Sequence, residues 1–148
     1  LNRPFGIAFG PDPANPKYLY IANTDSVVRF PYVPHQMAAE GQPEVIVAGL
    51  PTGGHSTRDI RFSPDGTRLF ISVGSKSNVA EGIEKKSDAE VKAIEATDGL
   101  GAGWGDEAGR ATVLVTSPAQ VRAGAPSGAS PTNATISATT CRRNMRPA

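Results

Sequence analysis

The chain has 148 residues, a length typical of about one domain. Its 15 Lys and Arg residues nearly balance its 14 Asp and Glu residues, so the charge does not indicate a nucleic-acid partner. No run of about 18 apolar residues occurs, so we expect no membrane span. Cys141 is the single cysteine, which excludes an internal disulfide and a cysteine-based metal cluster.

A weak internal repeat organises the first half of the chain. Ile7–Asp12 reads Ile-Ala-Phe-Gly-Pro-Asp, and Ile60–Asp65 reads Ile-Arg-Phe-Ser-Pro-Asp. Apolar runs follow both copies, at Tyr18–Ala22 and Leu69–Val73. An alternating strand, a Pro-Asp turn and a second apolar strand together predict a β-hairpin. A period of about 40–50 residues with about four strands per unit is typical of propeller blades.

The rest of the first unit fits two further strands, at residues 26–30 and 44–48, with an irregular loop over 31–43. Another strand begins at 111–115. We therefore expect an all-β fold, a partial β-propeller of about two blades over residues 1–115. Two blades cannot close a ring, because a propeller needs roughly four to eight.

A short helix is predicted inside the second unit. Ser87 is followed three residues later by Glu90, the pattern of a capping box. Gly99 is a natural stop, so the helix should cover about 88–97 and be inserted in a loop.

Residues 116–148 differ in composition from the rest. This tail is rich in Ala, Ser, Thr, Pro, Gly and Arg and has little apolar mass to bury, so we expect it to be disordered. Two interpretations stay open: a genuine low-complexity tail, or a reading-frame slip near residues 115–117. The nucleotide sequence would distinguish them.

The candidate site lies where the second unit begins. Residues 53–58 read Gly-Gly-His-Ser-Thr-Arg, so His55 and Arg58 stand at a strand entrance. Histidine takes up a proton near neutral pH, and arginine is a forked donor for carboxylates. A base and an anion clamp at one strand entrance indicate a site, although His55 also fits a turn residue and Arg58 a surface charge.

These patterns together resemble a known family. The elements at 4–9, 18–24, 53–58, 62–66 and 73–78 make the chain similar to the soluble pyrroloquinoline quinone (PQQ)-dependent sugar dehydrogenases. Within the glucose/sorbosone dehydrogenase family it looks closest to the sorbosone/pyranose dehydrogenase-like branch. The resemblance covers about residues 1–115 and implies a six-bladed β-propeller, of which this chain would be a fragment.

The resemblance also implies a chemistry. His55 matches the general base that takes a proton from the sugar hydroxyl while hydride moves to the quinone. Arg58 is the first candidate for holding a PQQ carboxylate, with Asn78 and Lys76 as lesser ones. The family also uses Ca²⁺, whose ligands we expect beyond residue 115, outside this fragment. Partners would be an aldose or sugar aldehyde and a soluble electron acceptor or cytochrome.

Several alternatives remain open at this stage. The glucose-oxidising branch has an acidic residue before its catalytic histidine, where this chain has Gly54, so sugar preference is open. Asp59 could replace that residue only if the loop turns back. Trp104 fits a sugar-stacking platform or a loop anchor, and His35 a surface position.

The function also has two readings. A non-catalytic β-propeller that binds a ligand or protein is the alternative to an enzyme. We expect the parent protein to be periplasmic or secreted, although no signal is present in this fragment. We expect the 148-residue chain to be inactive alone.

Overall fold

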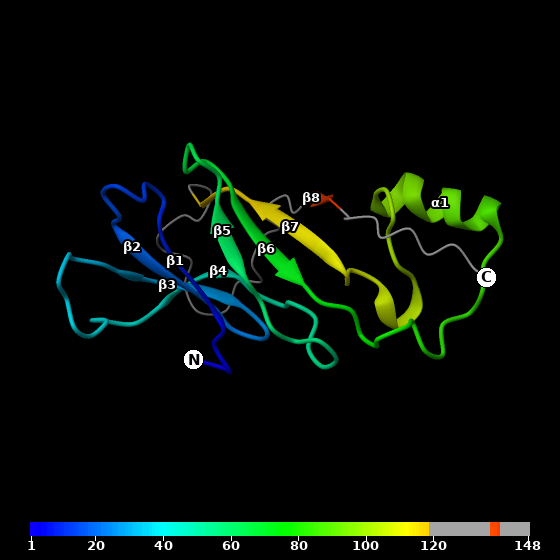
Figure 1. Ribbon diagram of the computed structural model, residues 1–148, viewed down its shortest axis with the longest axis horizontal. Helices are drawn as coiled ribbons and strands as arrows, with labels where there is room; N and C mark the ends of the chain where they lie inside the picture. The colour runs from blue at the N-terminus through cyan, green and yellow to red at the C-terminus, as the bar shows by residue number, and fades with distance from the viewer. Residues whose placement is uncertain (119–136, 140–148) are drawn as a thin grey trace.

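The structure is a computed structural model that describes residues 1–118 and the strand at 137–139. Figure 1 shows two β-sheets packed on each other, with one helix set apart from both. The elements are the strands β1 (Gly6–Gly10), β2 (Tyr18–Ala22), β3 (Val27–Pro31), β4 (Glu44–Val47), β5 (Ile60–Phe62), β6 (Leu69–Val73), β7 (Thr112–Thr116) and β8 (Ser137–Thr139), the helix α1 (Asp88–Asp98) and the 3₁₀ turn η1 (Gly105–Glu107).

Both sheets are antiparallel and follow the chain order, β1-β2-β3-β4 and β5-β6-β7-β8. We call them sheet 1 and sheet 2. The predicted repeat is therefore confirmed as two similar sheets, and the Pro-Asp turns form as expected. Asp12 Oδ1 accepts a hydrogen bond from the amide of Ala14 at 2.9 Å, and Asp65 Oδ1 accepts one from Thr67 at 3.1 Å.

The core lies between the two sheets. Leu69 and Ile71 of β6 pack against Tyr20 of β2, and all three side chains are at most 1% exposed. The rings of Tyr20 and Phe62 meet edge to face, with centroids 4.9 Å apart. Apolar side chains alternate along these strands, as expected for strands with one face buried.

The first strands of the two sheets lie side by side, which needs a small residue at Gly6. A Cβ at that position would lie 2.5 Å from the carbonyl oxygen of Arg58. This close contact fixes the start of sheet 2, and hence the loop before it, against sheet 1.

The inserted helix forms as predicted. The side chain of Ser87 accepts a hydrogen bond from the Glu90 amide, and the Glu90 carboxylate accepts one from the Ser87 amide, so both halves of the capping box are present. The helix ends at Gly99, whose φ of 101° is in the region that favours glycine.

Two predictions about the fold have other outcomes. Two stacked sheets do not make a closed ring, so the six-bladed propeller remains a prediction. The expected disorder of the tail falls largely on residues 119–136 and 140–148, which lie outside the described residues. Within the tail, Ser137–Thr139 forms β8 beside β7, which differs from the disorder expected there. In the described part of the chain, no helix is long and apolar enough to cross a membrane.

Candidate functional site

In an antiparallel hairpin the chain enters the first strand and leaves the second strand at the same end. The β4–β5 loop, residues 48–59, and the β6–β7 connection, residues 74–111, therefore emerge at the same end. They touch through the amide of His55, which donates to the carbonyl of Ser75 at 3.0 Å. The structure thus brings together the loops that carry the predicted site residues.

The imidazole of His55 is exposed and has a defined partner. Its Nε2 lies 2.8 Å from Oδ1 of Asn78. An amide oxygen only accepts hydrogen bonds, so for the neutral ring this arrangement selects the tautomer with the proton on Nε2 and the lone pair on Nδ1. Asn78 therefore orients the ring and leaves one basic nitrogen for chemistry. Asn78, rather than Asp59, is the partner of Nε2, while Oδ1 of Asp59 accepts a hydrogen bond from the amide of Ile60 at 2.9 Å.

Two glycines allow the loops to approach. A Cβ at Gly54 would lie 2.7 Å from the Cα of Lys76, and a Cβ at Gly74 would lie 2.7 Å from the Cβ of His55. Each loop therefore places a glycine against a site residue of the other. Gly54 also has a φ of 59°, which a side chain rarely adopts.

Arg58 does not share the exposed space of His55. Its side chain is 0% exposed, and Nη1 donates to the carbonyl of His55 at 3.2 Å and to that of Thr57 at 3.0 Å. Nη2 donates to the carbonyl of Pro51, and Nε has no hydrogen-bond partner. In this structure the buried Arg58 side chain therefore holds the backbone of the His55 loop in place. Its role in holding a cofactor carboxylate stays a prediction, and it would require these bonds to be given up.

Arg110 is a second buried arginine under the same loop. Its Nη1 donates to the carbonyl of Gly53 at 3.1 Å, and its Nη2 donates to that of Thr52. Burial lowers the pKa of the Arg58 guanidinium, and the neighbouring cation of Arg110 lowers it further. Arginine nevertheless stays charged at neutral pH. Neither guanidinium has an ion pair among the described residues, so the loop stands over two positive charges.

Glu107 fixes the other loop. Its Oε2 accepts a hydrogen bond from the amide of Lys76 at 2.8 Å, and its Oε1 accepts one from the amide of Ser77 at 3.0 Å. Sequence reasoning missed Glu107 and Arg110. The available clue was the Gly-rich stretch around Trp104, which places both residues in a tight loop near the strand that follows.

Lys76 is exposed, and its ammonium has no ion pair in the described structure. Its Nζ lies 3.5 Å from the position that a Cβ at Gly53 would occupy. Among the three predicted cofactor contacts, Lys76 therefore presents an exposed cation next to Gly53 in the loop that carries His55. No group of three or more His, Cys, Asp or Glu residues that could hold a metal ion occurs in the described ranges.

The structure also places two further residues that the sequence analysis named. His35 is exposed in the loop between β3 and β4, as expected. Trp104 donates from its indole nitrogen to the carbonyl of Glu84 at 2.8 Å, which agrees with a loop anchor.

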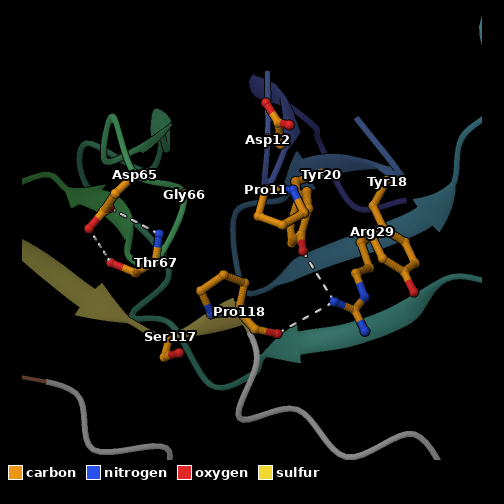
Figure 2. A pocket seen from close by; sticks show the side chains of 10 residues that line it. All are labelled: Pro11, Asp12, Tyr18, Tyr20, Arg29, Asp65, Gly66, Thr67, Ser117 and Pro118. Atoms are coloured by element: carbon orange, nitrogen blue, oxygen red, sulfur yellow. Dashed lines mark hydrogen bonds between the residues drawn. The ribbon is translucent and has the colours of Figure 1, made fainter. Parts of the chain in front are cut away.

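A cavity of about 520 Å³ lies at the opposite end of the sheets, beside the two Pro-Asp turns (Figure 2). Arg29 points into it, pairs with Glu44 at 2.7 Å and donates to the Tyr20 hydroxyl at 3.1 Å. The cavity contains no residue that the sequence analysis placed in the site: its lining is Pro11, Asp12, Tyr18, Tyr20, Arg29, Asp65, Gly66, Thr67, Ser117 and Pro118.

Comparison with known proteins gives one finding. A family model described as TrAA12-like matches residues 3–111, which include His55, Lys76, Asn78, Glu107 and Arg110. No curated protein and no solved structure matches the chain. The matched range covers both loops of the candidate site and most of the described chain. The chain therefore belongs to the TrAA12-like family, whose domains are similar to PQQ-dependent sugar dehydrogenases.

Proposed function

We propose that this chain is part of a PQQ-dependent sugar dehydrogenase that oxidises an aldose or a sugar aldehyde, with His55 as the general base. The sorbosone/pyranose dehydrogenase-like branch is our first choice. In this proposal the parent protein is periplasmic or secreted and passes electrons to a soluble acceptor or a cytochrome. The family match supports a PQQ-dependent oxidoreductase-like domain, and the sugar substrate and the branch are our proposal.

The observation that carries the proposal is the exposed, oriented imidazole of His55. The hydrogen bond of Nε2 to Asn78 fixes the ring and directs the proton to one nitrogen. Nδ1 is then the acceptor for a proton from a sugar hydroxyl. A general base needs a fixed geometry toward the proton that it removes, and the hydrogen bond to Asn78 fixes the ring.

The charges around the two loops fit an anionic cofactor. PQQ carries three carboxylates, and its quinone accepts the hydride when it is bound. Lys76 offers an exposed ammonium, while the buried Arg58 and Arg110 add a positive field beneath the loop. We assign the direct carboxylate contact to Lys76 first and to Arg58 only after rearrangement of its loop. The Ca²⁺ ligands remain proposed for residues beyond 115.

The fold proposal rests on the outer face of sheet 1. A row of apolar side chains crosses all four strands on the face turned away from sheet 2: Ile7, Ile21, Val28 and Val45. Ile7 is 59% exposed and Val45 is 54% exposed. A further sheet stacked on this face would bury Ile7 and Val45, as neighbouring blades do in a propeller, and would cover Ile21 and Val28, which are 8% and 5% exposed. We therefore propose that sheets 1 and 2 are adjacent blades of a six-bladed ring.

Replacement of His55 tests the function. In the full-length protein supplied with PQQ and Ca²⁺, His55→Ala should lower kcat/KM for the oxidised sugar by about 10²–10⁴-fold, the usual contribution of a general base. His35→Asn is the matched control, since His35 is exposed, lies in another loop and has a φ of 68° that asparagine tolerates. Near-normal turnover of His55→Ala would refute the proposal.

The binding-scaffold alternative predicts a different result in calorimetry. Titration of the full-length protein with PQQ in the presence of Ca²⁺ should release or absorb heat at a saturable site if the protein is a quinoprotein. A non-catalytic propeller that binds another ligand or a protein predicts no heat.

A further inference from the structure

We propose that Glu107 is a positioning residue that holds Asn78 against His55. Arg110, in the same turn, fixes the β4–β5 loop that carries His55. The inference rests on the proposed role of His55 and adds how that side chain is held. It follows from the hydrogen bonds made by residues 75–78 of the β6–β7 connection, which we call the second loop.

The second loop is fixed residue by residue from position 75 to position 78. The carbonyl of Ser75 accepts the amide of His55 at 3.0 Å. The next two amides, of Lys76 and Ser77, donate to the two oxygens of Glu107 at 2.8 and 3.0 Å. Asn78 then meets the imidazole at 2.8 Å. Without Glu107, the backbone between the first and last of these contacts would lose both of its fixed amides.

Glu107 is itself held rigidly. Its amide donates to the carbonyl of Trp104 at 3.1 Å, and its carbonyl accepts the amide of Arg110 at 3.0 Å. Gly103 packs closely on it, because a Cβ there would lie 2.6 Å from the Glu107 carbonyl oxygen. The backbone of Glu107 is thus held in a fixed turn, which limits where its carboxylate can lie.

Arg110 completes the arrangement on the other side. The turn that presents an acceptor to residues 76 and 77 also presents a donor to the carbonyls of residues 52 and 53. One short segment therefore holds both loops, because its two charged side chains form hydrogen bonds with backbone atoms of each. Hydrogen bonds to charged groups are stronger than those between neutral groups, which suits them to fix a geometry.

Nuclear magnetic resonance of the 148-residue chain tests the inference without cofactor or turnover. In the wild type, the imidazole nitrogens of His55 should report predominantly the Nε2–H tautomer. Glu107→Gln, whose amide NH₂ cannot accept a hydrogen bond, should shift these signals toward a mixture of tautomers, as should Asn78→Ala. Exchange of at least one of the Lys76 and Ser77 amides should accelerate about 10-fold or more, since glutamine keeps only one of the two acceptor oxygens.

Glu81→Gln is the matched control. It makes the same charge change in the same connection, at an exposed side chain for which the described structure shows no hydrogen bond or ion pair. It should leave both readouts at their wild-type values. Amide signals of β2 and β6 in the same spectra report whether each variant is folded.

The outcomes separate the two proposals. A folded Glu107→Gln variant with wild-type imidazole signals and amide exchange overturns the positioning role and leaves the dehydrogenase proposal intact. If Glu107→Gln does not fold, Glu107→Asp gives the same comparison. It keeps the charge but is one methylene too short to reach both amides, and wild-type signals in that variant also overturn the inference. A failed His55→Ala activity test would refute the reaction but would not alter these spectra.

Discussion

The two sheets connect their second and third strands in different ways at the same end of the molecule. Sheet 1 uses a tight turn, in which the amide of Asn23 donates to the carbonyl of Ser26 at 2.8 Å. Sheet 2 expands the same connection into residues 74–111, with α1 and η1 inside it. Figure 1 shows this insertion extending away from both sheets.

The difference divides the domain into a structural frame, which is the two sheets, and a candidate site, which is the insertion together with the His55 loop. The repeated strands supply the buried core, whereas the insertion supplies Lys76, Asn78, Glu107 and Arg110 around His55. A repeated sheet can thus gain a candidate site by lengthening one connection, since loops tolerate insertions better than the elements they join. This division predicts that core changes act on stability and insertion changes act on the site.

The largest expected effect is on the frame. Ile71→Ala removes a side chain that is 1% exposed between the sheets, so the free energy of unfolding should fall by about 2–5 kcal/mol. Val79→Ala, at a side chain 68% exposed in the insertion, should change it by at most about 0.5 kcal/mol. Urea denaturation of both variants provides the measurement. Equal losses would contradict the division.

An intermediate effect is expected where the two loops meet. Gly54→Ala combines a φ of 59° with a Cβ only 2.7 Å from the Cα of Lys76. It should cost about 1–3 kcal/mol and break the pairing of His55 with Asn78. Gly49→Ala has a similar φ of 72° but no heavy atom within 4 Å, so it should cost about 1–2 kcal/mol and leave the imidazole signals unchanged. Unaltered His55 signals in Gly54→Ala would argue against a tight contact between the loops.

The smallest effect concerns the Pro-Asp turns, which both repeats share. Hydrogen bonds from the Ser63 hydroxyl and from the amide and hydroxyl of Thr67 lower the pKa of Asp65 to about 2. A carboxyl with a lowered pKa in the folded state stabilises it above about pH 4, and this contribution disappears as the pH falls toward 2. Asp65→Asn should therefore flatten the loss of stability between about pH 4 and 2.

Acid denaturation followed by circular dichroism measures this slope. Asp12→Asn is the matched control in the first repeat, where the carboxylate accepts one bond, from the Ala14 amide. It should leave the acid part of the curve closer to that of the wild type. An Asp65→Asn curve that overlays the wild type would remove the difference between the two turns.

The repeat made much of the fold predictable. Alternating apolar residues and Pro-Asp turns are local patterns, so the six strands from Gly6 to Val73 and the helix after Ser87 could be placed from sequence. The burial of Arg58 could not, because a guanidinium at a strand entrance has the same local pattern whether it faces solvent or backbone carbonyls. The pairing of His55 with Asn78 depends on contact between two loops that are distant in sequence.

The close contacts of Gly54 with Lys76 and of Gly74 with His55 limit how this domain can be redesigned. A Cβ at either position would lie closer than 3 Å to backbone atoms of the other loop, so saturation libraries there should return few variants that keep the two loops in contact. Val79 lies in the same connection, is 68% exposed and has no proposed role, so it can be diversified without separating the two loops. Side-chain replacement is therefore better tolerated at such exposed positions than at the two glycines.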